Sequence, residues 1–305
     1  MTRLVTLPPT WTALLAVVCV GCSGVPEFDG LRAFADLEKQ CSFGPRVAGT
    51  TGHEKAGKFL FEQLRSTTDV CRTQKFTVYD SIAGIERNMF NIIASYYPES
   101  DRRVMICAHW DSRPRSDMDP DSSNIGLPIP GANDGASGAA LLLEMGRVLK
   151  NNRPPVGIDI VLFDGEDYGS AEWPGGWFLG SKHFVRSLKG YRPRAAILVD
   201  MIGDSDLLIY REAVSERYSK NLNDYIWTIA REVNADSFVD AVKDTVSDDH
   251  IPLIGAGIIA VDLIDFDYPY WHTQADTPDK CSYESLAEVG RVITAAIFDP
   301  RIRDF

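Results

Sequence analysis

The strongest constraint on the fold is the alternation of short apolar runs with segments in which apolar residues recur every three or four positions. Such runs are typical of buried strands, and such spacing is typical of amphipathic helices. Strands that alternate with helices favour helices packed on both faces of a mostly parallel sheet. We therefore predict a three-layer α/β/α sandwich with a central, mostly parallel mixed sheet. The expected strands are 74–79, 90–97, 104–108, 158–163, 196–202 and 258–264, and the expected helices are 52–64, 136–149, 177–187, 215–233 and 285–298.

The first 22 residues have the pattern of an export signal. Arg3 precedes an apolar run over 13–20 that is too short to cross a bilayer. Gly21 and Cys22 follow, as at the cleavage site of a bacterial lipoprotein, although an ordinary secretory signal also fits these residues. We therefore expect an exported protein, periplasmic or extracellular, with Cys22 as the candidate point of a membrane tether.

The rest of the chain contains no low-complexity tract and no internal repeat. We assign residues 1–22 to the signal peptide, 23–43 to a linker and N-terminal segment, and 44–305 to a single domain. Four cysteines of the mature chain could pair in three ways under oxidising conditions, and their spacing does not match a structural zinc site. They are Cys41, Cys71, Cys107 and Cys281.

Polar residues that could do chemistry stand at the ends of three expected strands. His109 follows one strand, Glu166 follows the next, and Asp200 lies near the end of a third. Each also has a structural explanation, as a strand-end histidine, a solvated acidic turn or a hydrogen-bonded buried acid. In open α/β sheets, however, the carboxyl ends of the strands form the ligand site. The shared position of these residues therefore predicts a functional site there.

Two adjacent acids carry a clear physical signal. Glu166 and Asp167 follow a buried strand, and burying two carboxylates together is costly without a cation or a shared proton. One of them can bind a metal ion while its neighbour acts as a general base. Asp134 stands in a Gly- and Ala-rich segment before a helix, where it could bind a metal ion or cap the helix.

Two later segments add an acid pair and a further histidine. Asp248 and Asp249 precede His250, either as part of a site or as a capped turn before a proline. His272 follows Trp271, either as a metal ligand at a pocket wall or as a rim histidine packed against the indole.

Composition limits what such a site can bind. The 305 residues include 31 Lys and Arg against 43 Asp and Glu, so the net charge is −12 and nucleic acid is not an expected partner. With only 5 His in the chain, a metal site must recruit carboxylates, and a mixed set of His and Asp or Glu suits zinc. We interpret His53 and His183 as structural. The absence of a Gly-x-Ser-x-Gly sequence disfavours a serine hydrolase.

Taken in order, these motifs resemble those of the zinc aminopeptidase and glutaminyl cyclase superfamily. The similarity runs from about Gly44 to the C-terminal helix. It rests on five motifs, which are His109-x-Asp111, Asn133-Asp134-Gly135, Glu166-Asp167, Asp200 and His272-Thr273. The resemblance implies a zinc exopeptidase-like fold for the domain over 44–305.

The resemblance also implies a role for each motif residue. Asp134, Asp167 and His272 would bind the principal zinc, and Glu166 would be the general base. In the dinuclear peptidases, the counterparts of His109 and Asp200 hold a second zinc. Asp167 departs from the superfamily pattern, in which a second Glu is usual.

Three features resemble the cyclases in particular. The pair Asp248 and Asp249 matches the cyclase acid pair and, with Asp200, would keep the general base oriented. Trp173 and Trp271 are similar to the indoles that contact the cyclase substrate. These features imply a glutaminyl-peptide cyclotransferase, which converts the N-terminal glutamine of a peptide or protein to pyroglutamate and releases ammonia.

Two other functions fit the same motifs. A zinc aminopeptidase would use Glu166 to activate water against the first peptide bond. It would hold two zinc ions, whereas a cyclase would hold one. A catalytically inactive binding domain on the same fold is a lesser alternative, because the general base and every candidate ligand position are present.

Overall fold

The computed structural model describes residues 24–68, 70–190 and 192–305. The expected signal peptide, including Cys22, lies outside these described residues. Among them, no helix is both long and apolar enough to cross a membrane. The strands are β1 (Val70–Asp80), β2 (Ile85–Tyr96), β3 (Arg103–His109), β4 (Gly157–Phe163), β5 (Ala195–Asp200), β6 (Ile209–Arg211), β7 (Phe238–Val242) and β8 (Ile259–Ile264).

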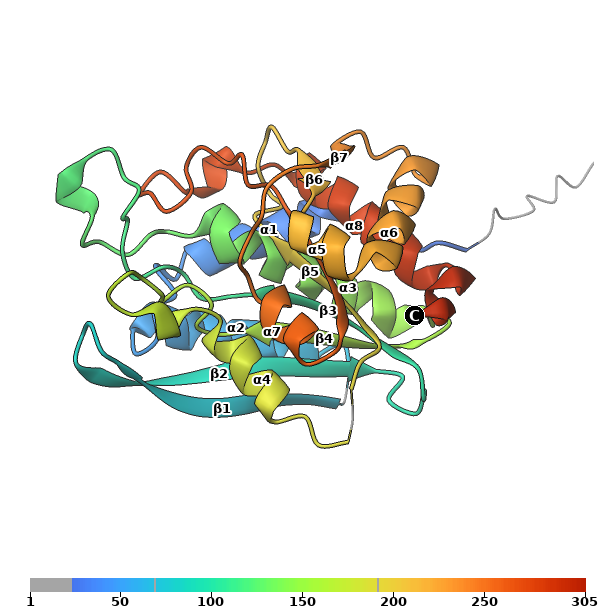
Figure 1. Ribbon diagram of the computed structural model, residues 1–305, viewed down its shortest axis with the longest axis horizontal. Helices are drawn as coiled ribbons and strands as arrows, with labels where there is room; N and C mark the ends of the chain where they lie inside the picture. Colours follow the sequence, from blue (N-terminus) through green and yellow to red (C-terminus); the bar gives the residue numbers. More distant parts are fainter. Residues whose placement is uncertain (1–23, 69, 191) are drawn as a thin grey trace, which may run out of the picture.

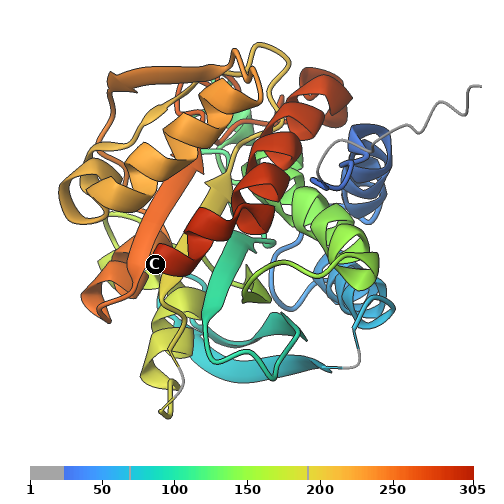
Figure 2. The same cartoon turned by 90° about the vertical axis from the view of Figure 1, so that its right-hand side faces the viewer.

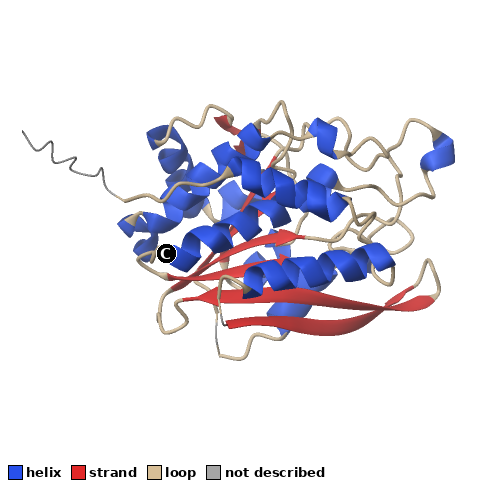
Figure 3. Ribbon diagram, turned by 180° about the vertical axis from the view of Figure 1, so that it is seen from behind, coloured by secondary structure: helices blue, strands red, loops and turns tan. Residues whose placement is uncertain are grey.

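A six-stranded sheet in the order β1-β2-β4-β3-β5-β8 forms the middle of the molecule (Figure 1). β4, β3, β5 and β8 run parallel, whereas β2 is antiparallel to both β4 and β1. The long β1–β2 hairpin therefore forms one edge, visible at the bottom of Figure 3. The predicted mixed, mostly parallel sheet is confirmed.

Helices pack on both faces of this sheet, as predicted for three layers. They are α1 (Gly30–Cys41), α2 (Thr51–Arg65), α3 (Gly138–Asn151), α4 (Leu179–Arg186), α5 (Ala213–Tyr218), α6 (Lys220–Glu232), α7 (His250–Gly255) and α8 (Tyr283–Phe298). One face packs against α1, α2, α3, α6 and α8, and Figure 2 shows α8 in red beside α1 and α3. The opposite face packs against the shorter helices α4 and α7.

The central strands are apolar on both sides because both sides are covered. In β3, Val104 and Ile106 face the larger helical layer, whereas Met105 and Cys107 face α4 and α7. All seven residues of β3 are buried. This pattern is typical of a parallel sheet between two helical layers and explains why the expected strands are continuous apolar runs.

The structure differs from the expected elements at several places, one of which is the short helix α7 that was not predicted. The segment 23–43, assigned as a linker and N-terminal segment, contains α1, whose Ala33 and Leu37 are buried against α3 and α8. The single helix expected over 215–233 is two helices, because the chain turns at Ser219, whose hydroxyl accepts the backbone N–H of Ala260. The short strands β6 and β7 pair in a separate small sheet that was not predicted.

The four candidate cysteines are all free thiols in the structure. Cys107 and Cys281 are buried, whereas Cys41 and Cys71 are half-buried. None of the three pairings that the sequence allows is formed.

Candidate active site

The predicted site residues meet at the carboxyl ends of three neighbouring strands. His109 is the last residue of β3, Glu166 follows β4, and Asp200 is the last residue of β5. They lie around a cavity of about 440 Å³, which all but His109 help to line. Other residues lining it come from loops, and they include Asp134, Asp167, Trp177, Asp248, Trp271 and His272.

Asp134, Asp167 and His272 form one group with the chemistry of a metal site. His272 Nε2 lies 3.6 Å from Asp134 Oδ2 and 3.4 Å from Asp167 Oδ1. Ligands held about 2.0–2.1 Å from a tetrahedral zinc are about 3.3–3.4 Å apart, so these separations fit one ion. Asp134 Oδ2 and Asp167 Oδ2 are buried and have no hydrogen-bond partner, as expected of oxygens reserved for a cation.

His109, Asp134 and Asp200 form a second group that shares Asp134 with the first. His109 Nε2 lies 3.2 Å from Asp134 Oδ1 and 3.1 Å from Asp200 Oδ1. These distances suit either a second ion or a proton on the imidazole that bonds to the two carboxylates. The structure thus brings together both ligand sets that the resemblance implied.

Two buried aspartates hold the loops that carry the ligands. Asp276 accepts the backbone N–H groups of Asn133 and Asp134 at 2.8 and 3.2 Å. Asp111 accepts those of Glu166 and Asp167 at 3.1 and 3.4 Å. These bonds fix the backbone from which each ligand projects.

Gly135 allows the loop after Asp134 to approach β3 closely. Its φ is +98°, and a Cβ there would lie 2.4 Å from the backbone oxygen of Asp111 and 2.9 Å from the His109 ring. Only glycine satisfies both the conformation and the space.

Arg113, which sequence reasoning missed, connects three parts of the site. Its guanidinium donates to Asp167 Oδ1 at 2.7 Å and also to both carboxylate oxygens of Asp117. Asp117 in turn lies 3.4 Å from His272 Nδ1. The guanidinium also lies 4.9 Å from the ring centre of Trp177. Arg113 therefore orients two candidate ligands and one wall of the cavity.

The two adjacent carboxyl groups at the end of β4 differ in proton affinity. Burial, followed by the charges of Asp167 and Asp248, raises the pKa of Glu166 well above its usual range. Burial opposes ionisation of Asp167 too, but His272 and Arg113 outweigh it and lower the pKa of Asp167. Neighbouring groups with opposite shifts can divide the roles of proton carrier and charged ligand.

The acid pair is split by the structure. Asp248 lines the cavity, whereas Asp249 turns toward α4 and accepts a hydrogen bond from Ser181. Burial and then Asp200 raise the pKa of Asp248 well above its usual range, and burial raises that of Asp249 to about 7. Of the two, Asp248 is therefore the one placed to act with Asp200 and Glu166.

The two candidate substrate indoles lie in different places. Trp271 lines the cavity and stacks on His272 with 3.8 Å between ring centres. Trp173 is not among the residues that line the cavity, and it packs instead near Met89 and Tyr168. An isolated β-bridge between Asp167 and Trp177 returns the chain to the site and puts Trp177 in the cavity wall. Trp177 thus takes the place that we expected for Trp173.

Three residues that line the cavity have strained backbones. Phe178, Met201 and His272 have φ values of +56°, +45° and +56°. Such values are rare for residues other than glycine and persist where the surrounding structure enforces them, often at functional sites.

His53 and His183, which we interpreted as structural, stack on aromatic rings and do not line this cavity. His53 Nε2 bonds to Asp164 Oδ2 at 2.9 Å and stacks on Trp110, and His183 stacks on Phe76. His250 is fully buried and does not line the cavity.

Comparisons with known proteins show which family this chain belongs to. A model of Peptidase family M28 matches residues 91–297. A crystal structure of Bacteroides thetaiotaomicron glutaminyl cyclase bound to N-acetylhistamine superposes with a TM-score of 0.87, at 35% identity over 90% of this chain and 99% of that chain. Aminopeptidase YwaD of Bacillus subtilis (strain 168) is 31% identical over 90% of this chain, which spans 58% of that protein. The glutaminyl-peptide cyclotransferase of Drosophila melanogaster is 24% identical over 82% of this chain and 75% of its own length.

The family match covers more than half of the chain, including Asp134, Glu166, Asp167, Asp200 and His272. The chain therefore belongs to Peptidase family M28.

Proposed function

We propose that this protein is a zinc-dependent glutaminyl-peptide cyclotransferase, which closes the N-terminal glutamine of a peptide or protein to pyroglutamate and releases ammonia. One observation carries the proposal: Glu166 lines the same cavity as the ligand group of Asp134, Asp167 and His272 and as the acid Asp248, with the indoles of Trp177 and Trp271 in its wall. The similarity to the Bacteroides cyclase over 99% of that chain supports it.

Asp134, Asp167 and His272 would hold one zinc ion, which when bound acts as a Lewis acid on the side-chain carbonyl of the glutamine. The shorter Asp167, where the superfamily usually has Glu, is compatible with this role because its carboxylate already lies within the ligand group and its Oδ2 has no hydrogen-bond partner. We propose a single ion because His109 Nε2 lies 3.1 Å from Asp200 and can hydrogen-bond to it directly. A proton on the imidazole would then take the place of a second ion in the group of His109, Asp134 and Asp200.

Glu166 would carry the proton of the reaction. The α-amino nitrogen attacks the side-chain amide carbon, so one C–N bond forms while the C–N bond to the leaving ammonia breaks. Glu166 would take a proton from the α-amino group and return it to the departing nitrogen. A carboxyl group whose pKa is raised by burial is suited to both transfers.

Two acids and two indoles of the cavity would orient the groups that take part in this proton transfer. Asp248 and Asp200 line the same cavity as Glu166 and would hold its carboxyl group through shared protons. Trp177 and Trp271 would hold the glutamine side chain folded back toward its own α-amino group. Both reacting groups belong to one residue, so fixing that conformation supplies most of the required proximity.

A zinc aminopeptidase is the second candidate, favoured by one observation. The group of His109, Asp134 and Asp200 can accept a second ion, and the shared ligand Asp134 could bridge it to the first. The similarity to Aminopeptidase YwaD supports this alternative.

A paired peptide assay separates the candidates. The purified protein is incubated with a Gln-initiated peptide and a Leu-initiated peptide, and products are followed by mass. We expect ammonia loss from the first peptide alone. Release of free leucine would overturn the cyclase in favour of the aminopeptidase, and zinc binding without any product would favour an inactive binding domain.

The cavity wall gives a matched pair of variants. Trp177→Ala should raise KM for the Gln-initiated peptide about tenfold or more, because it removes an aromatic contact. Trp173→Ala should leave KM unchanged, since Trp173 does not line the cavity. The reverse pattern would contradict the position that the proposal gives the substrate.

We also propose export with a lipid tether at Cys22, which rests on the sequence alone. Radiolabelled palmitate supplied to a bacterium expressing the full chain should label the protein, and Cys22→Ser should abolish the label. An unlabelled protein in the medium would contradict the tether and leave ordinary secretion.

A further inference from the structure

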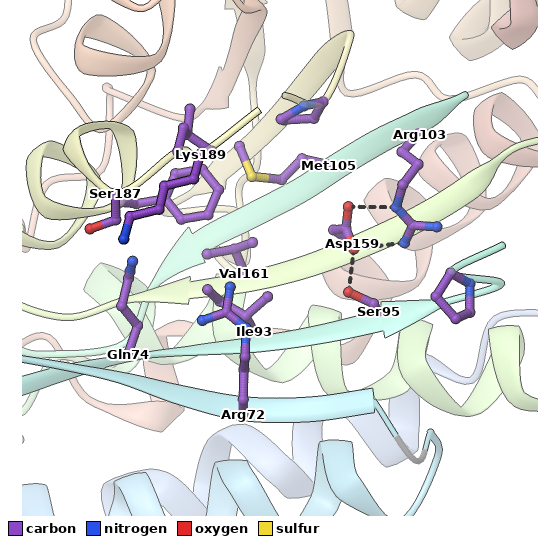
Figure 4. Close-up of a pocket in the computed structure, with 14 residues that line it drawn as sticks. Arg72, Gln74, Ile93, Ser95, Arg103, Met105, Asp159, Val161, Ser187 and Lys189 are labelled. Carbon is purple, nitrogen blue, oxygen red and sulfur yellow. Dashed lines mark hydrogen bonds and ion pairs between the residues drawn. The ribbon is translucent and has the colours of Figure 1, made fainter. Parts of the chain in front are cut away.

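A second cavity, drawn in Figure 4, lies toward the starts of β3 and β4, whereas the candidate active site lies at the carboxyl ends of these strands. Its volume is about 370 Å³, within the range of small-molecule sites. It forms beside the first halves of β3 and β4, where α4 ends and leaves part of the sheet face open. The two cavities share no lining residue.

The floor of this second cavity is apolar. Ile93, Met105 and Val161 project from three neighbouring strands, and Phe184 and Leu188 reach it from α4 and the segment after it. Such a floor favours an apolar group on the ligand.

The carboxylate in this cavity is already paired. Asp159 accepts two bonds from the Arg103 guanidinium at 2.7 and 3.0 Å and one from Ser95 at 2.5 Å, drawn as dashed lines in Figure 4. The Ser187 hydroxyl donates to the backbone oxygen of His183. The lining therefore offers a ligand few acceptors.

The Gln74 amide, in contrast, is fixed as a donor. The backbone N–H of Asp164 donates to Asn91 Oδ1 at 3.0 Å, so the other end of the Asn91 amide must be its NH₂ group. That NH₂ donates to the Gly180 carbonyl and to Gln74 Oε1, both at 2.9 Å. The NH₂ group of Gln74 is thereby left for the cavity, where it donates no hydrogen bond to a described residue.

Two cations stand beside this amide. Arg72 rises from β1 next to Gln74, and Lys189 reaches toward Gln74 from the segment after α4 (Figure 4). Neither forms an ion pair with any described residue, although the chain carries a net charge of −12. Unpaired like charges beside one cavity attract an anion, and the guanidinium fork matches a carboxylate in particular.

We propose that this cavity binds a carboxylate attached to an apolar body, with the carboxylate on Arg72, Gln74 and Lys189 and the body on the floor between β2 and α4. The ligand is either a free alkyl or aromatic acid or the C-terminal carboxylate of a peptide that ends in an apolar residue. This inference is independent of the proposed catalytic function.

The test measures binding to the zinc-loaded protein by calorimetry. One arm uses octanoate with octanol as its neutral counterpart, and the other uses a short peptide ending in leucine with its C-terminal amide. We expect at least one acid to bind. The affinity of its neutral counterpart should be lower by about tenfold or more. The arm with the tighter acid identifies the source of the carboxylate.

Three variants locate the site. Arg72→Gln removes the fork, and Gln74→Glu keeps the acceptor for Asn91 while replacing the donor with a carboxylate oxygen. Each should weaken the acid about tenfold or more, with unchanged turnover of the Gln-initiated peptide. Lys75→Gln makes the same charge change as Arg72→Gln on the other face of β1, where Lys75 lines a different cavity, and should leave binding unchanged.

Several results would overturn the proposal. They are no binding of either acid at millimolar concentration, equal binding of acid and neutral counterpart, or binding unaffected by Arg72→Gln and Gln74→Glu. The last result would place the acid elsewhere, for example at the zinc site.

Discussion

The two ends of the central sheet treat buried carboxylates in opposite ways. Near the start of β4, Asp159 is paired on both oxygens by Arg103 and Ser95. At the carboxyl ends of the strands, Asp134, Asp167 and Asp248 each keep a buried oxygen without a hydrogen-bond partner. Burying an unpartnered charge costs far more than burying a paired one. Asp159, paired on both oxygens, therefore serves the fold. The acids that keep one oxygen without a partner, including Asp167 whose other oxygen bonds Arg113, mark the end of the sheet that awaits a cation and a substrate, which we call the unpaired end.

The largest effect should come from the proton carrier at the unpaired end. Glu166→Gln keeps the shape of the side chain but removes its proton chemistry, so turnover should fall by about 10²–10⁴. Zinc content, measured by elemental analysis, should not change, because Glu166 is not in either ligand group. The exposed Glu172→Gln is the control, and near-normal turnover of Glu166→Gln would show that another group carries the proton.

A substitution at Asp159, the acid paired on both oxygens, should change the stability of the protein and not its catalytic activity. Asp159→Asn leaves the buried Arg103 charge without its carboxylate, which should lower the free energy of unfolding by about 3–5 kcal/mol. Urea denaturation measures this loss, with the exposed Asp101→Asn as the control. Turnover per folded molecule should stay normal, and a variant that keeps its stability but loses activity would break the contrast between the two ends.

Arg113 tests how far the unpaired end depends on its supports. Arg113→Lys keeps a positive charge but loses the fork that joins Asp167 to Asp117. We expect zinc affinity to fall about tenfold to a hundredfold in competition with a chelator, as for other residues that orient metal ligands.

Arg115→Lys is the matched control, because Arg115 bonds only backbone oxygens of Tyr168 and Gly169. Equal zinc affinity in Arg113→Lys and the native protein would limit Arg113 to the cavity wall.

The smallest expected effect is a gain in stability, whereas Asp159→Asn should cause a loss. In zinc-free protein, Asp248→Asn should raise the free energy of unfolding by about 1 kcal/mol, because folding no longer has to protonate a carboxyl group buried beside Asp200. The pKa of Asp248 is raised on folding, so native stability is lost as pH rises through that pKa. The advantage of the variant should therefore grow in thermal melts as pH rises above the ordinary titration range of an aspartate. Destabilisation by Asp248→Asn would contradict the unpaired state of this carboxyl group.

Local sequence patterns were sufficient to predict the central sheet and the edge of the sheet at which the candidate site lies. Apolar runs marked the central strands, and polar residues immediately after them located His109, Glu166 and Asp200 at one edge. Two adjacent acids after a buried strand also signalled a cation site, and the structure brings Asp167 into a ligand group.

Features that depend on how distant loops meet could not be predicted. In the sequence, Arg113 and Asp276 have the features of ordinary loop residues. Only the fold places Arg113 in contact with Asp167, and Asp276 in contact with the backbone of Asp134. Trp173 is nearer than Trp177 to Glu166 in sequence, but the bridge between Asp167 and Trp177 reverses that order in space. The helix α1 was missed because its buried stripe is short and surrounded by charged residues.

If the acids at the carboxyl ends of the strands serve cyclisation and not hydrolysis, no oxygen from water enters the product, and oxygen-18 water tests this most directly. The zinc-loaded protein is incubated in that water with a Gln-initiated peptide, and the products are analysed by mass spectrometry. The account predicts a peptide that has lost one ammonia and contains no oxygen-18. Free glutamine carrying oxygen-18 in its carboxylate would contradict it.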